Sequence, residues 1–239
     1  MRFEGYAIII GAMKSGTTTL HHILNQHPEI VGGVRKELNF FRRGNRPEGI
    51  VAAYESLFPR LDKTRHAYTL DSSPNYTKPG IWRFAPSLIA QLPGRKRLIY
   101  ILRNPLERID SHIAHNIAQG RWTADNWRLN HVVNVSAYSR QLAKFESAGL
   151  LDDILLLDFA DLTADPVGFA YRVHDFLGLQ RVRPRSVERR NVRKVNGRFL
   201  RPDHLPRLRQ LLQRDVQTLI TRYGFEPARS WGIHEPAPE

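Results

Sequence analysis

Short apolar runs recur along the chain, and most of them lack the polar alternation of a half-exposed strand. They cover Ala7–Ile10, Leu98–Leu102 and Ile154–Leu157, with a less apolar run at Tyr68–Asp71. Such runs predict strands buried on both faces, as in a parallel sheet. The segments between them predict helices over 17–25, 51–58, 82–91, 105–119, 134–148, 165–177 and 205–223. This alternation implies an α/β fold, a three-layer sandwich with a central parallel sheet and a ligand site at the carboxyl ends of its strands.

The first predicted strand runs into a loop whose residues suit an anion. Gly11 ends the strand at a turn, and the helix that starts at Thr17 aims its first backbone N–H groups and its positive dipole end at the loop. Lys14 adds a mobile positive charge. Hydroxyl groups in the same stretch come from Ser15, Thr17, Thr18 and Thr19. The stretch predicts a P-loop-like anion site, with a glycine-rich turn that binds no ligand as the alternative.

The order of lysine and glycine separates this loop from that of nucleotide triphosphatases. There the lysine follows the second glycine, whereas Lys14 precedes Gly16. The order K-S-G-T-T-T-L instead resembles the 5′-phosphosulfate loop of sulfotransferases that use 3′-phosphoadenosine 5′-phosphosulfate (PAPS). The resemblance implies that PAPS is the co-substrate and that it is bound by Lys14, Ser15, Gly16, Thr17, Thr18 and Thr19. It also implies a catalytic role for Lys14, which would meet the charge that grows on the leaving phosphate.

A second motif of the same enzymes follows the strand predicted near residues 97–103. The sequence R-N-P-L-E-R-I-D-S, from Arg103 to Ser111, resembles their 3′-phosphate motif, R-x-P-x-x-R-x-x-S. The resemblance implies that Arg103 binds the 3′-phosphate as a bidentate donor and Ser111 as a neutral one. His115 lies on the same helix face as Ser111 and matches a histidine proposed to assist catalysis in the heparan N-sulfotransferases. A satisfied structural histidine is the alternative for His115.

Two further stretches resemble the heparan-type branch of these enzymes. A Lys-Glu pair that ends at Glu37 and is followed by Phe-Phe resembles a segment whose glutamate is the proposed general base. The resemblance implies that role for Glu37, and a surface ion pair beside a core anchor is the alternative. Near the other end of the chain, Gly197 and Arg198 match a Lys-Gly-Arg element that contacts the cofactor, although Asn196 occupies the lysine position.

Composition limits the class of protein. At 239 residues the chain suits one sulfotransferase domain over 1–239, with residues 230–239 as a flexible tail. The absence of cysteine excludes disulfides and thiolate metal sites, and no metal-ligand cluster is visible, so no metal is expected. Met1 is followed by neither an apolar leader nor a membrane span. If Met1 is the natural start, we expect a soluble, cytoplasmic protein with no membrane partner.

Together these features predict a PAPS-dependent sulfotransferase. It would move a sulfuryl group to a hydroxyl or amine of a small-molecule or carbohydrate acceptor by in-line displacement. The first alternative is an ATP- and magnesium-dependent kinase, with Ile154–Asp158 as the strand that holds the metal. The second is a nucleic-acid-binding protein, since the net charge is +13 and the excess of cations lies between residues 181 and 214. We expect no nucleic-acid partner, because neither a helix-turn-helix nor an aromatic-rich surface is visible.

Overall fold

The chain forms two compact units, each built from two separate stretches of sequence. The computed structural model describes residues 2–42, 48–188, 198–227 and 231–232. Unit 1 consists of Met1–Leu102 and Lys144–Asn191, and unit 2 of Arg103–Ala143 and Val192–Glu239. The expectation of a single domain stays a prediction, as does the flexible tail, which lies almost entirely outside the described residues.

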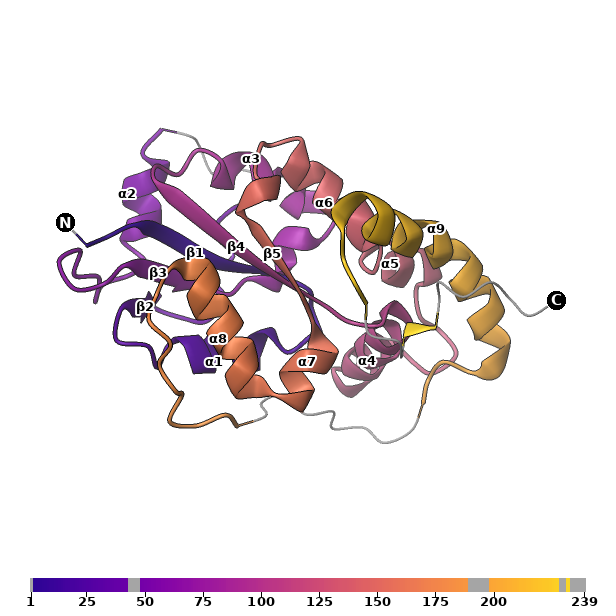
Figure 1. The fold of residues 1–239 in the computed structure, drawn as a ribbon. Coiled ribbons are helices and arrows are strands. Elements are labelled where there is room, and N and C mark those ends of the chain that lie inside the picture. Colours follow the sequence, from indigo (N-terminus) through magenta and orange to yellow (C-terminus); the bar gives the residue numbers. More distant parts are fainter. Residues whose placement is uncertain (1, 43–47, 189–197, 228–230, 233–239) are drawn as a thin grey trace. The chain divides into compact units, whose positions relative to one another are not determined.

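Unit 1 contains the predicted parallel sheet. Its described strands are β1 (Gly5–Gly11), β2 (Ile30–Gly32), β3 (Tyr68–Asp71), β4 (Arg95–Leu102) and β5 (Ile154–Asp158). All pairs are parallel and the order is β2-β3-β1-β4-β5 (Figure 1). The chain builds the sheet to one side of β1 and then crosses to the other, so the loop after β1 lies at the switch point. In open α/β sheets ligands bind at such a point.

Helices cover both faces of this sheet, which confirms the three-layer α/β fold (Figure 1). One face packs against α1 (Thr17–Leu24), α7 (Phe159–Ala164) and α8 (Pro166–Leu177). On the other face Tyr6 of β1 lies against Tyr54 of α2 (Ile50–Glu55), with ring centroids 5.8 Å apart. The side chains from Tyr6 to Ile10 are at most 1% exposed, which explains why β1 shows no polar alternation.

Two predicted helices differ from the structure, and buried polar contacts or proline explain both. The segment 82–91 contains a 3₁₀ turn over Gly80–Phe84, and α3 (Ala85–Ile89) begins only where Pro86 fits a first helical turn. The predicted helix 134–148 is shorter in the structure, where α6 covers Tyr138–Glu146 and a separate helix, α5 (Leu129–Asn134), ends before it. The second break occurs because Asp215 accepts hydrogen bonds from the backbone N and the Oγ of Ser139 at the start of α6 (3.1 and 2.6 Å).

Unit 2 is helical in its described part. It contains α4 (Pro105–Ala118), α5, the start of α6 and α9 (Leu205–Tyr223). Its apolar core joins α4, α5 and α9 and is formed by Ile109, Ile113, Val132, Leu200, Leu208 and Leu212. Leu200 belongs to the segment before α9, so this core also holds that segment.

Unit 1 contains a buried pair of histidines, His27 and His174. His174 of α8 is 2% exposed, its ring lies 4.8 Å from that of His27, and neither of its nitrogens has a hydrogen-bond partner among the described residues. Both ring nitrogens of His27 have partners, because Nδ1 accepts from Glu29 N and Nε2 lies 3.1 Å from the carbonyl oxygen of Gln180. Burial, with the neighbouring His27, lowers the pKa of His174 to about 4.

We therefore expect His174→Phe to remove part of the acid sensitivity of the fold. The pKa of His174 is lower in the folded than in the unfolded chain, so protons favour unfolding as pH falls from about 6.5 to 4. At pH 5 this histidine alone should lower the free energy of unfolding by about 2 kcal/mol relative to pH 7.5. Urea unfolding at both pH values measures the effect. An equal loss of stability in the wild type and in His174→Phe would contradict it.

Candidate active site

The loop between β1 and α1 is held in a shape that only glycine allows at one position. Gly16 precedes α1 with φ 79°, and a Cβ placed there would lie 2.6 Å from Leu162 Cδ2 and 2.9 Å from Phe159 Cε2. Lys14 also has a positive φ, 72°. A left-handed residue on each side of Ser15 curls the backbone tightly into the first turn of α1. The loop therefore has the tight strand-to-helix turn expected of an anion site.

Most of the residues that carry hydroxyl groups in this loop and in the first turn of α1 are buried. Ser15 is completely buried, Thr17 is 5% exposed and Thr19 is 8% exposed, whereas Lys14 and Thr18 are half-buried. Ser15 Oγ has no hydrogen-bond partner within the described residues. A buried hydroxyl without a partner costs free energy, so its presence in this loop fits a ligand oxygen that completes its bonding. No side chain caps the amino end of α1, which leaves that end for an anion.

The predicted base lies in a second loop of unit 1, between β2 and α2. Glu37 is 41% exposed at its side chain, and Lys36 Nζ donates a hydrogen bond to Glu37 Oε1 (3.0 Å). Lys36 Nζ also lies 3.4 Å from the carbonyl oxygen of Ser72, just after β3. The ion pair is thus fixed to the carboxyl end of the sheet, and the Glu37 carboxylate stays open to solvent on that side of its loop.

The end of β3 supports both loops. Asp71 is fully buried, and its Oδ1 accepts a hydrogen bond from the backbone N of Leu38 (3.3 Å). His21 Nδ1, on α1, lies 2.8 Å from Ser72 Oγ. Burial, with Lys36 and His22 nearby, lowers the pKa of His21 to about 3, so this ring is neutral at physiological pH. The polar residues after β3 therefore connect the helix of the anion loop to the loop that carries Glu37.

Of the predicted 3′-phosphate residues, Ser111 lies on α4 and Arg103 just before this helix, both in unit 2. Asn104 caps this helix by accepting a hydrogen bond from Leu106 N (3.0 Å), which fits the first-turn proline. Arg103 is 22% exposed, and its Nη2 pairs with Glu107 Oε2 at 3.1 Å. Ser111 and His115 are half-buried and one turn apart on the same helix. A phosphate bound by Arg103 would have to compete with the Glu107 carboxylate.

Arg198 is tied to the same helix by its neighbours. Asp110 Oδ1 accepts hydrogen bonds from Phe199 N (2.7 Å) and Leu200 N (2.9 Å). Asp110 directly precedes Ser111, so the chain at Arg198 is attached beside the predicted 3′-phosphate residues. Gly197 and the Asn196 position of the same predicted element lie outside the described residues.

The predicted site residues thus form two groups, one in each unit. Unit 1 holds the anion loop from Lys14 to Thr19 together with Glu37, and unit 2 holds Arg103, Ser111, His115 and Arg198. Within each group the structure supports the predicted placement on loops and helices. That both groups bind one nucleotide, and the choice between Glu37 and His115 as base, stay predictions.

Other expected features concern metal, membrane and surface charge. The described ranges contain no group of three or more His, Cys, Asp or Glu side chains placed to hold a metal ion. Among the described helices, none combines the length and apolarity that a membrane span requires.

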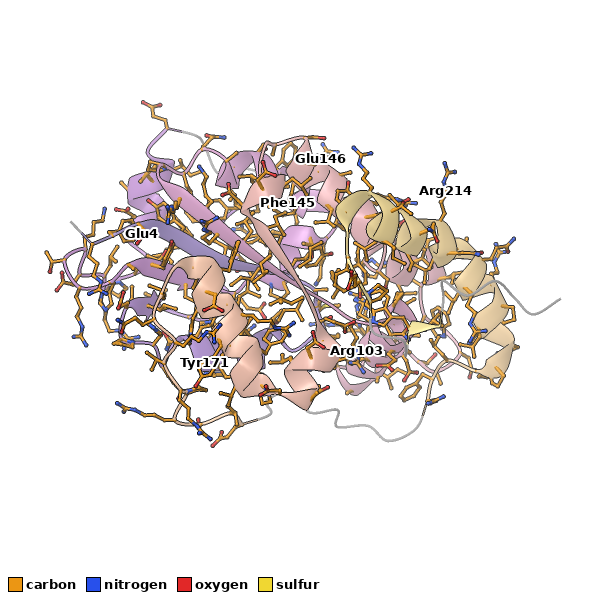
Figure 2. The ribbon with its side chains drawn as sticks, in the orientation of Figure 1. Glu4, Arg103, Phe145, Glu146, Tyr171 and Arg214 are labelled. Atoms are coloured by element: carbon orange, nitrogen blue, oxygen red, sulfur yellow. The ribbon has the colours of Figure 1, made fainter. Side chains whose placement is uncertain are left out.

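The exposed arginines of α9 account for part of the basic segment between residues 181 and 214, and Figure 2 shows Arg214 projecting away from this helix.

Comparison with known proteins identifies the family. Residues 5–196 match the sulfotransferase domain family, and the chain belongs to it. It is 32% identical over 189 residues to heparan sulfate glucosamine 3-O-sulfotransferase 6 of Homo sapiens, covering 74% of this chain and 53% of that protein. It is 25% identical over 195 residues to the human bifunctional heparan sulfate N-deacetylase/N-sulfotransferase 2, covering 72% of this chain and 22% of that protein. The chain therefore spans about half, or less, of the length of these relatives.

A solved structure agrees with the fold. The crystal structure of a sulfotransferase from Alicyclobacillus acidocaldarius superposes with a TM-score of 0.74 and covers 97% of this chain and 99% of that one. The two sequences are 21% identical, so the similarity concerns the fold. The predicted fold class, with its P-loop-like loop after β1, is confirmed.

Proposed function

We propose that this chain transfers a sulfuryl group from PAPS to a hydroxyl or amine of a carbohydrate acceptor. The observation that carries the proposal is the loop after β1, where the buried Ser15 Oγ is without a hydrogen-bond partner among the described residues beside the uncapped start of α1. Membership of the sulfotransferase domain family supports the same reaction. Both a 3-O- and an N-sulfotransferase of heparan sulfate are among its relatives, which supports a carbohydrate acceptor and leaves hydroxyl and amine open.

In the proposed reaction the acceptor oxygen or nitrogen attacks sulfur while the bond from sulfur to the bridging phosphate oxygen breaks. The products are the sulfated acceptor and 3′-phosphoadenosine 5′-phosphate (PAP). Glu37 takes the proton that the acceptor loses. Lys14 and the first N–H groups of α1 stabilise the charge that develops on the leaving phosphate. Arg103 and Ser111 bind the 3′-phosphate, Arg198 contacts the nucleotide, and no step needs a metal ion.

A binding titration separates this function from its alternatives. We expect PAP to bind in the absence of magnesium, with much weaker binding of ATP with magnesium and of a DNA oligonucleotide at 150 mM salt. A kinase would prefer ATP with magnesium, and a nucleic-acid-binding protein would bind DNA with steep salt dependence. Either preference would contradict the proposal.

Transfer of radiolabelled sulfate from PAPS to desulfated heparan fragments then tests the acceptor class. Action in the cytoplasm stays a prediction.

The attachment of Arg198 to α4 gives a further prediction. Asp110→Ala removes the acceptor of two backbone N–H groups, so we expect about tenfold weaker PAP binding, with kcat at saturating PAPS little changed. Asp110→Asn keeps a side-chain oxygen at this position and should bind PAP nearly as the wild type does. Calorimetric titration measures both. Equal PAP affinity in Asp110→Ala and the wild type would contradict the prediction.

A further inference from the structure

The backbone that follows Glu37 is held at successive amides by the residues at the end of β3. Each of these bonds crosses from one loop to the other: Leu38 N donates to Asp71 Oδ1 (3.3 Å), Asn39 N to Ser73 Oγ (2.9 Å) and Phe40 N to Tyr76 OH (2.9 Å). Residues 33–42, which are described in this loop, form no strand or helix that could fix it. Its conformation, including φ 53° at Asn39, is therefore set by these side chains.

All of these bonds lead to one carboxylate. Ser73 Oγ donates to Asp71 Oδ1 (2.6 Å), and Tyr76 OH donates to Asp71 Oδ2 (2.7 Å). Each hydroxyl accepts from the loop and donates to Asp71, so the direction of every bond is fixed. Only a group that accepts on both oxygens satisfies this arrangement, and an ionised carboxylate does so.

Asp71 sits in a fully buried position with few charges around it. Tyr54 OH of α2 lies 3.5 Å from Oδ2, Tyr76 faces it from the turn after β3, and Lys36 is the nearby cation on the Glu37 loop. Burial raises the pKa of Asp71 to about 6, while the hydrogen bonds from Ser73, Tyr76 and Leu38, and Lys36, oppose that rise. The carboxylate is thus ionised and able to accept all of its bonds at pH 7.5 and above.

We propose that Asp71 is a positioning residue for the transfer reaction, which holds the loop of Glu37 so that its carboxylate meets the proton of the acceptor. The inference rests on the proposed function and on Glu37 as the base. Asp71 acts through Ser73 and Tyr76 on the backbone, and it touches neither substrate. A base displaced by about 1 Å loses much of its effect, because proton transfer requires a close, aligned contact.

Asp71→Asn tests this role at nearly constant volume. The amide places an N–H₂ group opposite hydroxyls that already donate, so the network loses a bond and the loop shifts. At pH 7.5 we expect kcat to fall about tenfold or more, with the KM for PAPS and the Kd for PAP within about threefold of the wild type. Tyr76→Phe should lower kcat in the same way. Tyr68→Phe is the matched control, because the Tyr68 hydroxyl bonds to Glu4, away from the loop.

The decisive comparison places Asp71→Asn in a Glu37→Gln background. If Asp71 acts through Glu37, it should lower kcat in the wild type but have little further effect once Glu37 is replaced. Equal losses of kcat in both backgrounds, or an unchanged kcat in Asp71→Asn, would overturn the proposal for Asp71. The proposed function would still be supported in that case if Glu37→Gln itself lowers kcat. Normal turnover of Glu37→Gln would overturn both the base and this inference. Should Asp71→Asn fail to fold, Tyr76→Phe in the two backgrounds gives the same test.

Discussion

Lys14→Ala is expected to reduce the rate of sulfuryl transfer by about 1,000-fold while the fold is retained. Lys14 is half-buried in the loop after β1, beside the buried Ser15 and the start of α1. As the bond to sulfur breaks, negative charge grows on the leaving phosphate, and a fixed cation there stabilises the transition state more than the ground state. The loss should therefore appear in kcat at saturating PAPS, alongside weaker binding of the 5′-phosphate end of the nucleotide.

The measurement for Lys14 is single-turnover transfer from radiolabelled PAPS, with circular dichroism to check the fold. Lys96→Ala is a matched control, because Lys96 is a half-buried lysine near the amino end of β4, where its Nζ bonds to the carbonyl of Leu92. The control should turn over at the wild-type rate. Normal kcat in Lys14→Ala would show that the chemistry assigned to the loop is wrong.

Glu37→Gln is expected to lower kcat by about 100- to 1,000-fold without weakening PAP binding. Glutamine keeps the size of the side chain and its contact with Lys36, but it cannot take a proton from the acceptor. Since Glu37 belongs to the loop after β2 and not to the anion loop, the affinity for PAP should stay within about twofold of the wild type.

Steady-state kinetics at saturating PAPS and a PAP titration test the two halves of this prediction. Glu55→Gln is the control. Glu55 lies at the end of α2, accepts hydrogen bonds from Tyr6 and Lys63, and takes no part in the proposed reaction. If Glu37→Gln kept its turnover, the base would have to be sought elsewhere, with His115 as the next candidate.

The strands could be predicted from sequence because burial on both faces leaves a direct local signature. The apolar run before Gly11 is the central strand β1 of the parallel sheet, and the run before Asp158 is its edge strand β5. The long helix α9 was equally clear, since Gly224 ends it with a left-handed φ. The helices that were missed are short. The break before α6, for example, depends on Asp215, 76 residues away from Ser139.

The site divides in the same way between local and distant determinants. The residues proposed for the anion loop and for the motif from Arg103 to Ser111 are contiguous, so sequence alone was enough to propose them. Asp71 and Asp110 act on backbone groups 33 and 89 residues away, and no local spacing reveals such contacts. The sequence signal for Asp71 was a carboxylate at the end of a predicted buried strand, directly followed by Ser-Ser-Pro.

The account depends on one nucleotide being bound by Lys14 at its 5′ end and by Arg103 at its 3′ end. Calorimetric titration of the wild type, Lys14→Ala and Arg103→Ala with PAP, adenosine 5′-phosphate and adenosine 3′-phosphate tests this most directly. We predict that Arg103→Ala abolishes the preference for PAP over the 5′-phosphate, and that Lys14→Ala abolishes the preference for PAP over the 3′-phosphate. Substitutions that weakened recognition of the same phosphate, or of neither, would contradict it.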